Sequence, residues 1–179
     1  MSSGLSRKVS LCGIFVSLAL MLSYLESFVP VGFFAGVPGF KLGFANIAVL
    51  VVYFSAGPYC AAAVSLIRII VSSVLFGSVT TFWFSLSGGL LSFAALVLLS
   101  RLYPGRVGMI GISVVCAAMH NTGQIAAAAV LMKTASVFGY LPYLLLLSVP
   151  CGIITGAVSA ALFRHTGKIA ETPGRRVRT

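Results

Sequence analysis

Long apolar runs separated by short polar or glycine- and proline-containing breaks dominate the chain. A run of roughly 20 apolar residues crosses a bilayer as a helix, whereas a membrane β-barrel needs alternating segments of about ten residues. The runs do not alternate, so they predict an all-α, six-transmembrane-helix bundle. The second run is short for a span. The predicted spans lie at about residues 9–29, 43–56, 58–77, 80–100, 107–132 and 139–163.

Composition strengthens the membrane prediction. Of 179 residues, 59% are hydrophobic and only 8% are charged, and the mean hydropathy is +1.11. A soluble domain of this length is about 25% charged, because its surface needs polar cover. We therefore expect a single membrane domain over residues 1–179, ending in a basic cytoplasmic tail at 164–179.

Basic residues set the predicted orientation. Six spans place both termini on one side, and positive charge favours the cytoplasmic side of a membrane. Lys41 and Lys133 fall on the opposite side, and Arg68 lies within a span. This distribution predicts a multi-pass plasma-membrane protein with cytoplasmic termini and argues against a nucleic-acid-binding patch. Nine basic residues share the predicted cytoplasmic side: Arg7, Lys8, Arg101, Arg106, Arg164, Lys168, Arg175, Arg176 and Arg178.

The first apolar run follows Arg7 and Lys8, as the apolar run of a signal peptide follows its basic segment. No A-x-A-like cleavage site comes after it, and the run is long for a signal peptide. We expect it to remain in the membrane as an uncleaved first span.

The chain lacks the side chains that most membrane enzymes need. It has no aspartate, and Glu26 and Glu171 are its only acids. Diphosphate chemistry on magnesium requires several carboxylates, and the phosphate-cradling G-x-x-x-x-G-K-[ST] motif is missing. The four cysteines form no C-x-x-C pair. We therefore expect no enzymatic activity, no cofactor and no bound metal.

Polar residues inside the predicted spans are the candidate site. A charge at the middle of a span costs about 2.5–3.5 kcal/mol on insertion scales, so such residues pair with one another or line a pathway. Three hypotheses stay open: a structural polar network, a site for a polar ligand, and a proton relay through His120. The candidate substrate-binding residues are Glu26, Lys41, Asn46, Arg68, His120, Asn121 and Gln124.

Small residues form a second pattern. In membranes they let helix backbones approach closely. In span four (Ser85, Gly88, Gly89, Ser92) and span six (Gly152, Gly156, Ser159) we expect packing within the bundle. Span one carries them on a face opposite Ala19, Ser23 and Glu26, which predicts a docking face for a membrane partner. That predicted face consists of Ser10, Gly13 and Ser17.

Four motifs carry a family resemblance: "PGFKLGFAN" at 38–46, "SLIRIIVSSVLFG" at 65–77, "SLSGGLLS" at 85–92 and "HNTGQ" at 120–124. Over residues 8–165 the chain resembles the Gx transporter family, whose members are often labelled heptaprenyl diphosphate synthase component I. That family is similar to the S component of energy-coupling-factor transporters. The resemblance implies six helices, a vitamin-sized ligand bound near the outer face, and docking through helix one to a transmembrane subunit that carries two ATPases.

The sequence and the resemblance together favour one function. We expect a membrane substrate-binding subunit of a small-molecule uptake transporter, with the ligand, the lipid bilayer and possible energy-coupling subunits as partners and no nucleic acid. The alternative is a non-catalytic membrane subunit of a heptaprenyl diphosphate synthase or of a flavin-linked redox complex.

Overall fold

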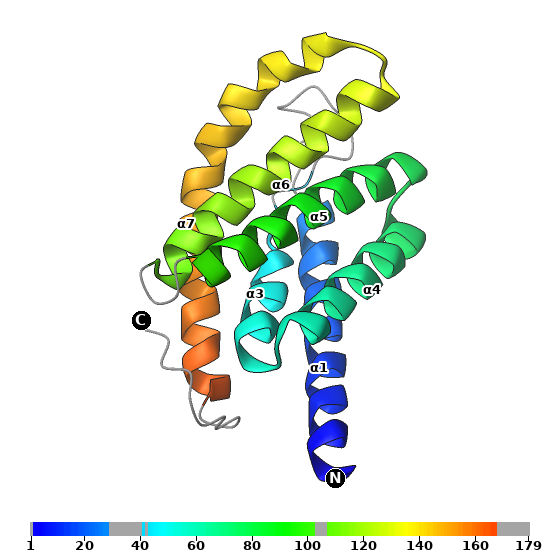
Figure 1. The fold of residues 1–179 in the computed structure, drawn as a ribbon. Helices are drawn as coiled ribbons and strands as arrows, with labels where there is room; N and C mark the ends of the chain where they lie inside the picture. The colour runs from blue at the N-terminus through cyan, green and yellow to red at the C-terminus, as the bar shows by residue number, and fades with distance from the viewer. Residues whose placement is uncertain (1, 29–40, 42, 103–106, 168–179) are drawn as a thin grey trace.

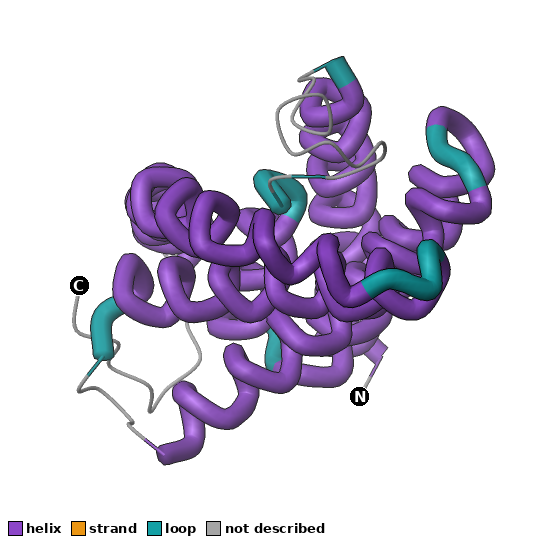
Figure 2. The backbone as a smooth tube through the Cα atoms, turned by 90° about the horizontal axis from the view of Figure 1, so that it is seen from above, coloured by secondary structure: helices purple, strands orange, loops and turns teal. Residues whose placement is uncertain are grey.

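The computed structural model of the protein describes residues 2–28, 41, 43–102 and 107–167, and all its regular elements there are helices (Figure 2). Side-chain surroundings are described from residue 9 to residue 165 of these stretches. The elements are α1 (Ser2–Ser27), α3 (Asn46–Ser55), α4 (Pro58–Phe76), α5 (Val79–Leu102), α6 (Met109–Leu131), the 3₁₀ helix η1 (Ala135–Tyr140) and α7 (Leu141–Gly167).

Five helices are long and apolar enough to cross a membrane: α1, α4, α5, α6 and α7, the last continuous with η1. Large apolar side chains are exposed along them, including Ile14 on α1, Val74 on α4 and Leu146 on α7. In a bilayer such side chains face lipid. The all-α prediction is therefore confirmed for the described residues, and their five long apolar helices support a multi-pass membrane bundle, although the predicted count of six spans is not reached there.

The second predicted span, residues 43–56, is not a full span. It forms the ten-residue helix α3, which at 1.5 Å per residue is about 15 Å long against a hydrocarbon core of about 30 Å. Residues 47–53 are all buried. The run is apolar because protein surrounds it on every side, so hydropathy alone could not show how far it reaches.

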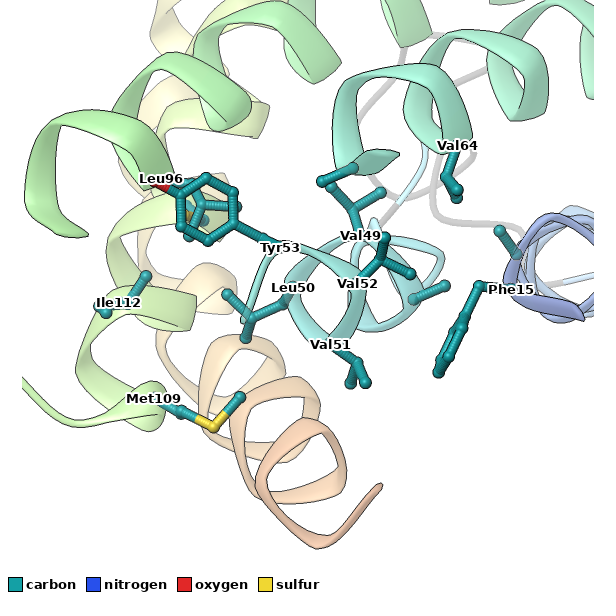
Figure 3. Packing of buried hydrophobic residues seen from close by; sticks show 14 of the residues in the cluster. Phe15, Val49, Leu50, Val51, Val52, Tyr53, Val64, Leu96, Met109 and Ile112 are labelled. Atoms are coloured by element: carbon teal, nitrogen blue, oxygen red, sulfur yellow. The ribbon is translucent and has the colours of Figure 1, made fainter. Parts of the chain in front are cut away.

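Helix α3 forms the centre of the main hydrophobic core. Its side chains Val49, Leu50 and Val52 pack among residues of the surrounding helices, as Figure 3 shows. The neighbours include Phe15 of α1 and Val64 of α4. Burying the short helix in this way satisfies its apolar side chains without any contact with lipid.

The helices alternate in direction, so the bundle has two distinct ends. Figure 1 shows the start of α1, the α3–α4 turn and the end of α7 toward the bottom of the view, which we call the termini end. The α4–α5 turn and η1 lie toward the top, at what we call the loop end.

Positive charge follows the same division. Arg101 lies in the last turn of α5 and Arg164 in the last turn of α7, whereas Lys133 lies between α6 and η1 at the loop end. The start of α1 and the end of α7 both lie at the termini end (Figure 1). Arg106 and the tail at 168–179 lie outside the described residues.

Glycines set the closest helix crossings. A Cβ placed on Gly123 of α6 would lie 2.6 Å from the Ser87 carbonyl oxygen and 2.8 Å from the Gly88 Cα of α5. One placed on Gly156 of α7 would lie 2.6 Å from the Ile110 Cα of α6. The predicted internal packing of the small residues in spans four and six is confirmed, and Gly123 adds a position that the sequence pattern did not single out.

Candidate functional site

The predicted site residues are buried, although every one of them is polar or charged. Six of them are nearly inaccessible (Glu26, Lys41, Arg68, His120, Asn121 and Gln124), and Asn46 is half-buried. They come from α1, α3, α4, α6 and the stretch that leads into α3. The bundle therefore gathers polar side chains in its interior, and their partners decide what they do.

Gln124 holds the chain just before α3. The backbone N–H of Lys41 donates to Gln124 Oε1 (3.2 Å), and Gln124 Nε2 donates to the Lys41 carbonyl oxygen (2.9 Å). Both contacts are buried. The side-chain amide of Gln124 thus pairs with both the N–H and the C=O of Lys41. Away from water, leaving either backbone group unpaired would cost several kcal/mol.

Glu26, near the end of α1, contacts the same stretch at Gly43, two residues after Lys41. Its Oε1 accepts a hydrogen bond from the backbone N–H of Gly43. Gly43 has a φ of +86°, and a Cβ there would lie 3.0 Å from Asn46 Nδ2 and 3.3 Å from His120 Cδ2. Glycine is needed here both for the left-handed backbone and for the close approach of these side chains. Gly43 lies in the quoted "PGFKLGFAN" motif but was not predicted as a site residue.

Arg68 joins the group through α3. Its Nη2 donates to Asn46 Oδ1 (3.4 Å). Arg68 lies ten residues after Pro58, the first residue of α4, about 15 Å along that helix. The first residue of α3 is therefore level with the middle of α4, well inside the bundle.

His120 packs against α5. A Cβ placed on Gly88 would lie 2.9 Å from both His120 Cε1 and His120 Nδ1. His120 and Gln124 are one helical turn apart and so share a face of α6. The crossing of α5 and α6 therefore fixes the position of this face. We call Glu26, Lys41, Asn46, Arg68, His120 and Gln124 the polar cluster.

Several atoms of the polar cluster lack partners. Among the described residues, buried side-chain atoms without a hydrogen-bond partner are Glu26 Oε2, Arg68 Nε, His120 Nδ1, Ser23 Oγ and Ser73 Oγ. Three of these belong to the cluster. Buried polar groups in native proteins are nearly always paired, so a concentration of unpaired ones calls for a partner from outside the chain.

The charges of the cluster influence one another. Burial lowers the pKa of the Lys41 ammonium; the carboxylate of Glu26 raises this pKa and the guanidinium of Arg68 lowers it. Two cations therefore share one carboxylate. An additional negative group near Lys41 would favour its charged form.

Asn121 faces a different neighbour. Its Nδ2 donates to the Leu144 carbonyl oxygen (3.1 Å) and to Ser148 Oγ (2.9 Å), both on α7. One residue along a helix turns the side chain by about 100°, so Asn121 leaves the face shared by His120 and Gln124. Among the described residues, its hydrogen bonds join α6 to α7 and do not reach the polar cluster.

A small cavity adjoins the cluster. It measures about 20 Å³, room for roughly one water molecule. Gly43 and Asn46 line it together with hydroxyl and thiol side chains from four helices: Ser65, Ser92, Ser113, Cys116, Cys151 and Thr155. Uncharged polar groups therefore continue from the cluster into the bundle.

The predicted docking face lies on the outside of the bundle. Ser10, Gly13 and Ser17 are exposed, and a Cβ on Gly13 would meet nothing within 4 Å. Ala19, Ser23 and Glu26, on the other face of α1, are buried. Helix α1 is the least buried of the five long helices, so this face is free to contact lipid or another protein.

Comparison with protein families places the chain. Residues 15–162 match the family described as heptaprenyl diphosphate synthase component I. The chain belongs to this family. The matched region contains the whole polar cluster but only Ser17 of the predicted docking face. The family's name describes one component of a synthase and therefore implies association with other components. Comparison with curated proteins and with solved structures finds no match.

Proposed function

We propose that the protein is a membrane substrate-binding subunit, similar to the S component of an energy-coupling-factor transporter, that binds a small polar or amphipathic molecule at the polar cluster. The observation that carries this proposal is the set of unpaired buried atoms on Glu26, Arg68 and His120. A purely structural network would be expected to satisfy its members, since a buried unpaired group costs about 1–3 kcal/mol.

The ligand enters, in this proposal, from the loop end, which we place outside the cytoplasm. The basic residues at the termini end support this orientation, because positive charge favours the cytoplasmic side. Glu26 lies one residue before the end of α1, so the cluster is closer to the loop end of that helix than to the termini end. Energy for uptake comes from partner subunits, with Ser10, Gly13 and Ser17 as the docking face.

Six of the seven predicted site residues remain in the proposed site. We assign Asn121 to the packing of α6 on α7, because both of its bonds reach α7. Gln124 and Glu26 position the backbone around residues 41 and 43, and Lys41, Arg68 and His120 offer polar atoms to the ligand.

Mass spectrometry of small molecules extracted from the purified full-length protein tests the proposal. We expect one molecule to co-purify with the wild-type protein and to be depleted in His120→Gln, which alters the cluster. Ser159→Ala is the matched control, because Ser159 is equally buried but bonds to Thr155 on its own helix. Extraction of no molecule from the wild type, or equal recovery from His120→Gln, would contradict the proposal.

A second candidate function is a non-catalytic membrane subunit of a prenyl diphosphate synthase, which the family's name favours. Both candidates use a partner on α1, so the partner's identity separates them. Affinity purification of the wild type would recover ATPase-linked subunits in the first case and a soluble synthase subunit in the second. Gly13→Leu should release either partner while the bundle remains folded, since the position is open.

A further inference from the structure

The start of α3 lies in the interior of the bundle, and the backbone N–H groups of Asn46 and Ile47 donate to the carbonyl oxygens of Gly43 (2.9 Å) and Phe44 (3.0 Å). Asn46 is the first residue of α3 and contacts Arg68 midway along α4. The N-cap residue is Ala45, whose side chain cannot cap the helix. A helix N-terminus carries the equivalent of about half a positive charge, and half-helices in transporters point this end at anionic groups of their substrates.

The cluster's one carboxylate is already in use. Glu26 Oε1 accepts the backbone N–H of Gly43, three residues before α3 begins. Its charge therefore lies beside the backbone that leads into α3. One carboxylate is left to balance the N-terminus of α3 as well as the formal charges of Lys41 and Arg68.

Arg68 has unused hydrogen-bonding capacity. A guanidinium carries five N–H donors. Among the described residues, Arg68 donates one hydrogen bond, to Asn46, and its Nε has no partner. The side chain is only 3% exposed. A buried cation without a counter-charge is costly, and a charge-assisted bond to an oxyanion is the strongest contact that a guanidinium makes.

We infer that Arg68 and Lys41, beside the positive end of the α3 dipole, bind an oxyanion, a phosphate or a carboxylate group of the ligand. This inference rests on the proposed function and specifies the chemical class of its ligand. A cationic ligand would meet two buried cations, and a neutral one would leave Glu26 as the cluster's single counter-charge for both of them. The oxyanion belongs either to a soluble molecule or to a lipid headgroup.

Thermal unfolding of the full-length protein in detergent tests the inference, with phosphate, pyrophosphate and acetate as probes and choline as the cationic comparison. Chloride keeps the ionic strength constant. We expect at least one oxyanion to raise the melting temperature in a saturable manner and choline to have no effect. Arg68→Gln should weaken oxyanion binding roughly 10- to 100-fold, the range for a bond to a charged group.

Further variants test the sign of the charge. Glu26→Gln keeps an oxygen for the Gly43 N–H but removes the negative charge, so oxyanion affinity should rise. Should that variant fail to fold, Lys41→Gln replaces it: the backbone contacts with Gln124 remain, and affinity should fall. Lys133→Gln, an exposed site at the loop end, should leave affinity unchanged. Choline shifts larger than oxyanion shifts, or wild-type affinity in both Arg68→Gln and Lys41→Gln, would overturn the inference.

Nanodiscs identify the source of the oxyanion. Pyrophosphate stabilisation in phosphatidylcholine that disappears when phosphatidylglycerol is added indicates a headgroup, whereas stabilisation in both indicates a soluble ligand. Failure of this inference is distinct from failure of the proposed function. If a neutral or cationic molecule co-purifies with the wild type and is depleted in His120→Gln, the proposed function is supported. The inference of an oxyanion ligand is then refuted.

Discussion

The surroundings of α3 differ between its two ends: they are mainly apolar toward the termini end and polar at its start. Toward the termini end, aliphatic and aromatic side chains surround the helix, and one side-chain hydrogen bond, between the hydroxyl groups of Tyr53 and Ser100, joins it to α5. At its start, polar side chains from α1 and α6 hold the residues that precede it by their backbone groups. Regular helix inside a membrane protein needs only apolar neighbours, but irregular backbone needs a partner for each N–H and C=O.

This difference explains why the buried residues of the polar cluster do not simply destabilise the bundle. Gln124 and Glu26 satisfy backbone groups that no helix satisfies. Arg68 and His120 exceed that requirement, because each keeps an unpaired nitrogen. The apolar half is therefore saturated by its own contacts, whereas the polar half has binding capacity left over.

The largest expected effect is on the helix crossing that supports the polar half. Gly123→Ala would place a methyl group 2.6 Å from the Ser87 carbonyl oxygen, and backbone cannot move aside as a side chain can. We expect the variant to lose most of its accumulation in the membrane. Gly13→Ala, also within a helix but with open space around it, should accumulate normally. Normal accumulation and melting temperature of Gly123→Ala would show that the crossing is looser than described.

Removing an apolar side chain from α3 should affect stability alone. Leu50 is 4% exposed in the core, and Leu50→Ala should lower the free energy of unfolding by about 2–5 kcal/mol through the cavity it leaves. Because Leu50 lies on the helix and not in the cluster, oxyanion affinity should change less than about twofold. Denaturation of the purified protein and the oxyanion titration measure the two quantities. A large loss of affinity would mean that the two halves are coupled.

Gln124→Ala and Asn121→Ala test two different roles on α6: Gln124 positions the backbone of Lys41, and Asn121 packs α6 on α7. Gln124→Ala removes the two contacts with Lys41, and we expect ligand binding to weaken by about 1–3 kcal/mol, roughly 5- to 150-fold. Asn121→Ala removes bonds to α7, so the melting temperature should fall while the ligand-induced shift stays at the wild-type value. The reverse order of effects would place Asn121 in the site and make Gln124 structural.

The smallest perturbation tests which half faces outward. In a background without the four native cysteines, Ser136→Cys lies at the loop end and Arg164→Cys at the termini end, and both positions are exposed. An impermeant thiol reagent applied to intact cells should label residue 136 and not residue 164. Labelling of residue 164 alone would invert the proposed orientation.

Sequence reasoning located the long helices because each has a continuous apolar surface, which hydropathy detects. It overestimated α3 because a helix buried in protein and a helix facing lipid have the same hydropathy. The hydrogen bond between Gly43 and the carboxylate of Glu26 joins residues 17 positions apart in the chain. Such a contact leaves no local pattern.

The sequence identified the polar residues because polar side chains inside a membrane span are unfavourable. It did not identify their hydrogen-bond partners. Helical spacing places His120 and Gln124 on one face of α6, but Asn121 was predicted to share their site. That Asn121 meets α7 depends on which helix packs there, which the spacing of one helix does not determine. The close contacts of Gly88 and Gly123 are likewise a property of two helices together.

The contact between Gln124 and residue 41 has a consequence for how such a site can change. The side-chain amide of Gln124 bonds only to the backbone N–H and C=O of residue 41, as a neighbouring β-strand would. These contacts do not depend on the side chain at position 41. Exchanging that side chain would therefore alter the charge offered to a ligand without loosening its anchor. In the proposed site, a single substitution at residue 41 would therefore change the charge beside the ligand and leave the backbone contacts with Gln124 in place.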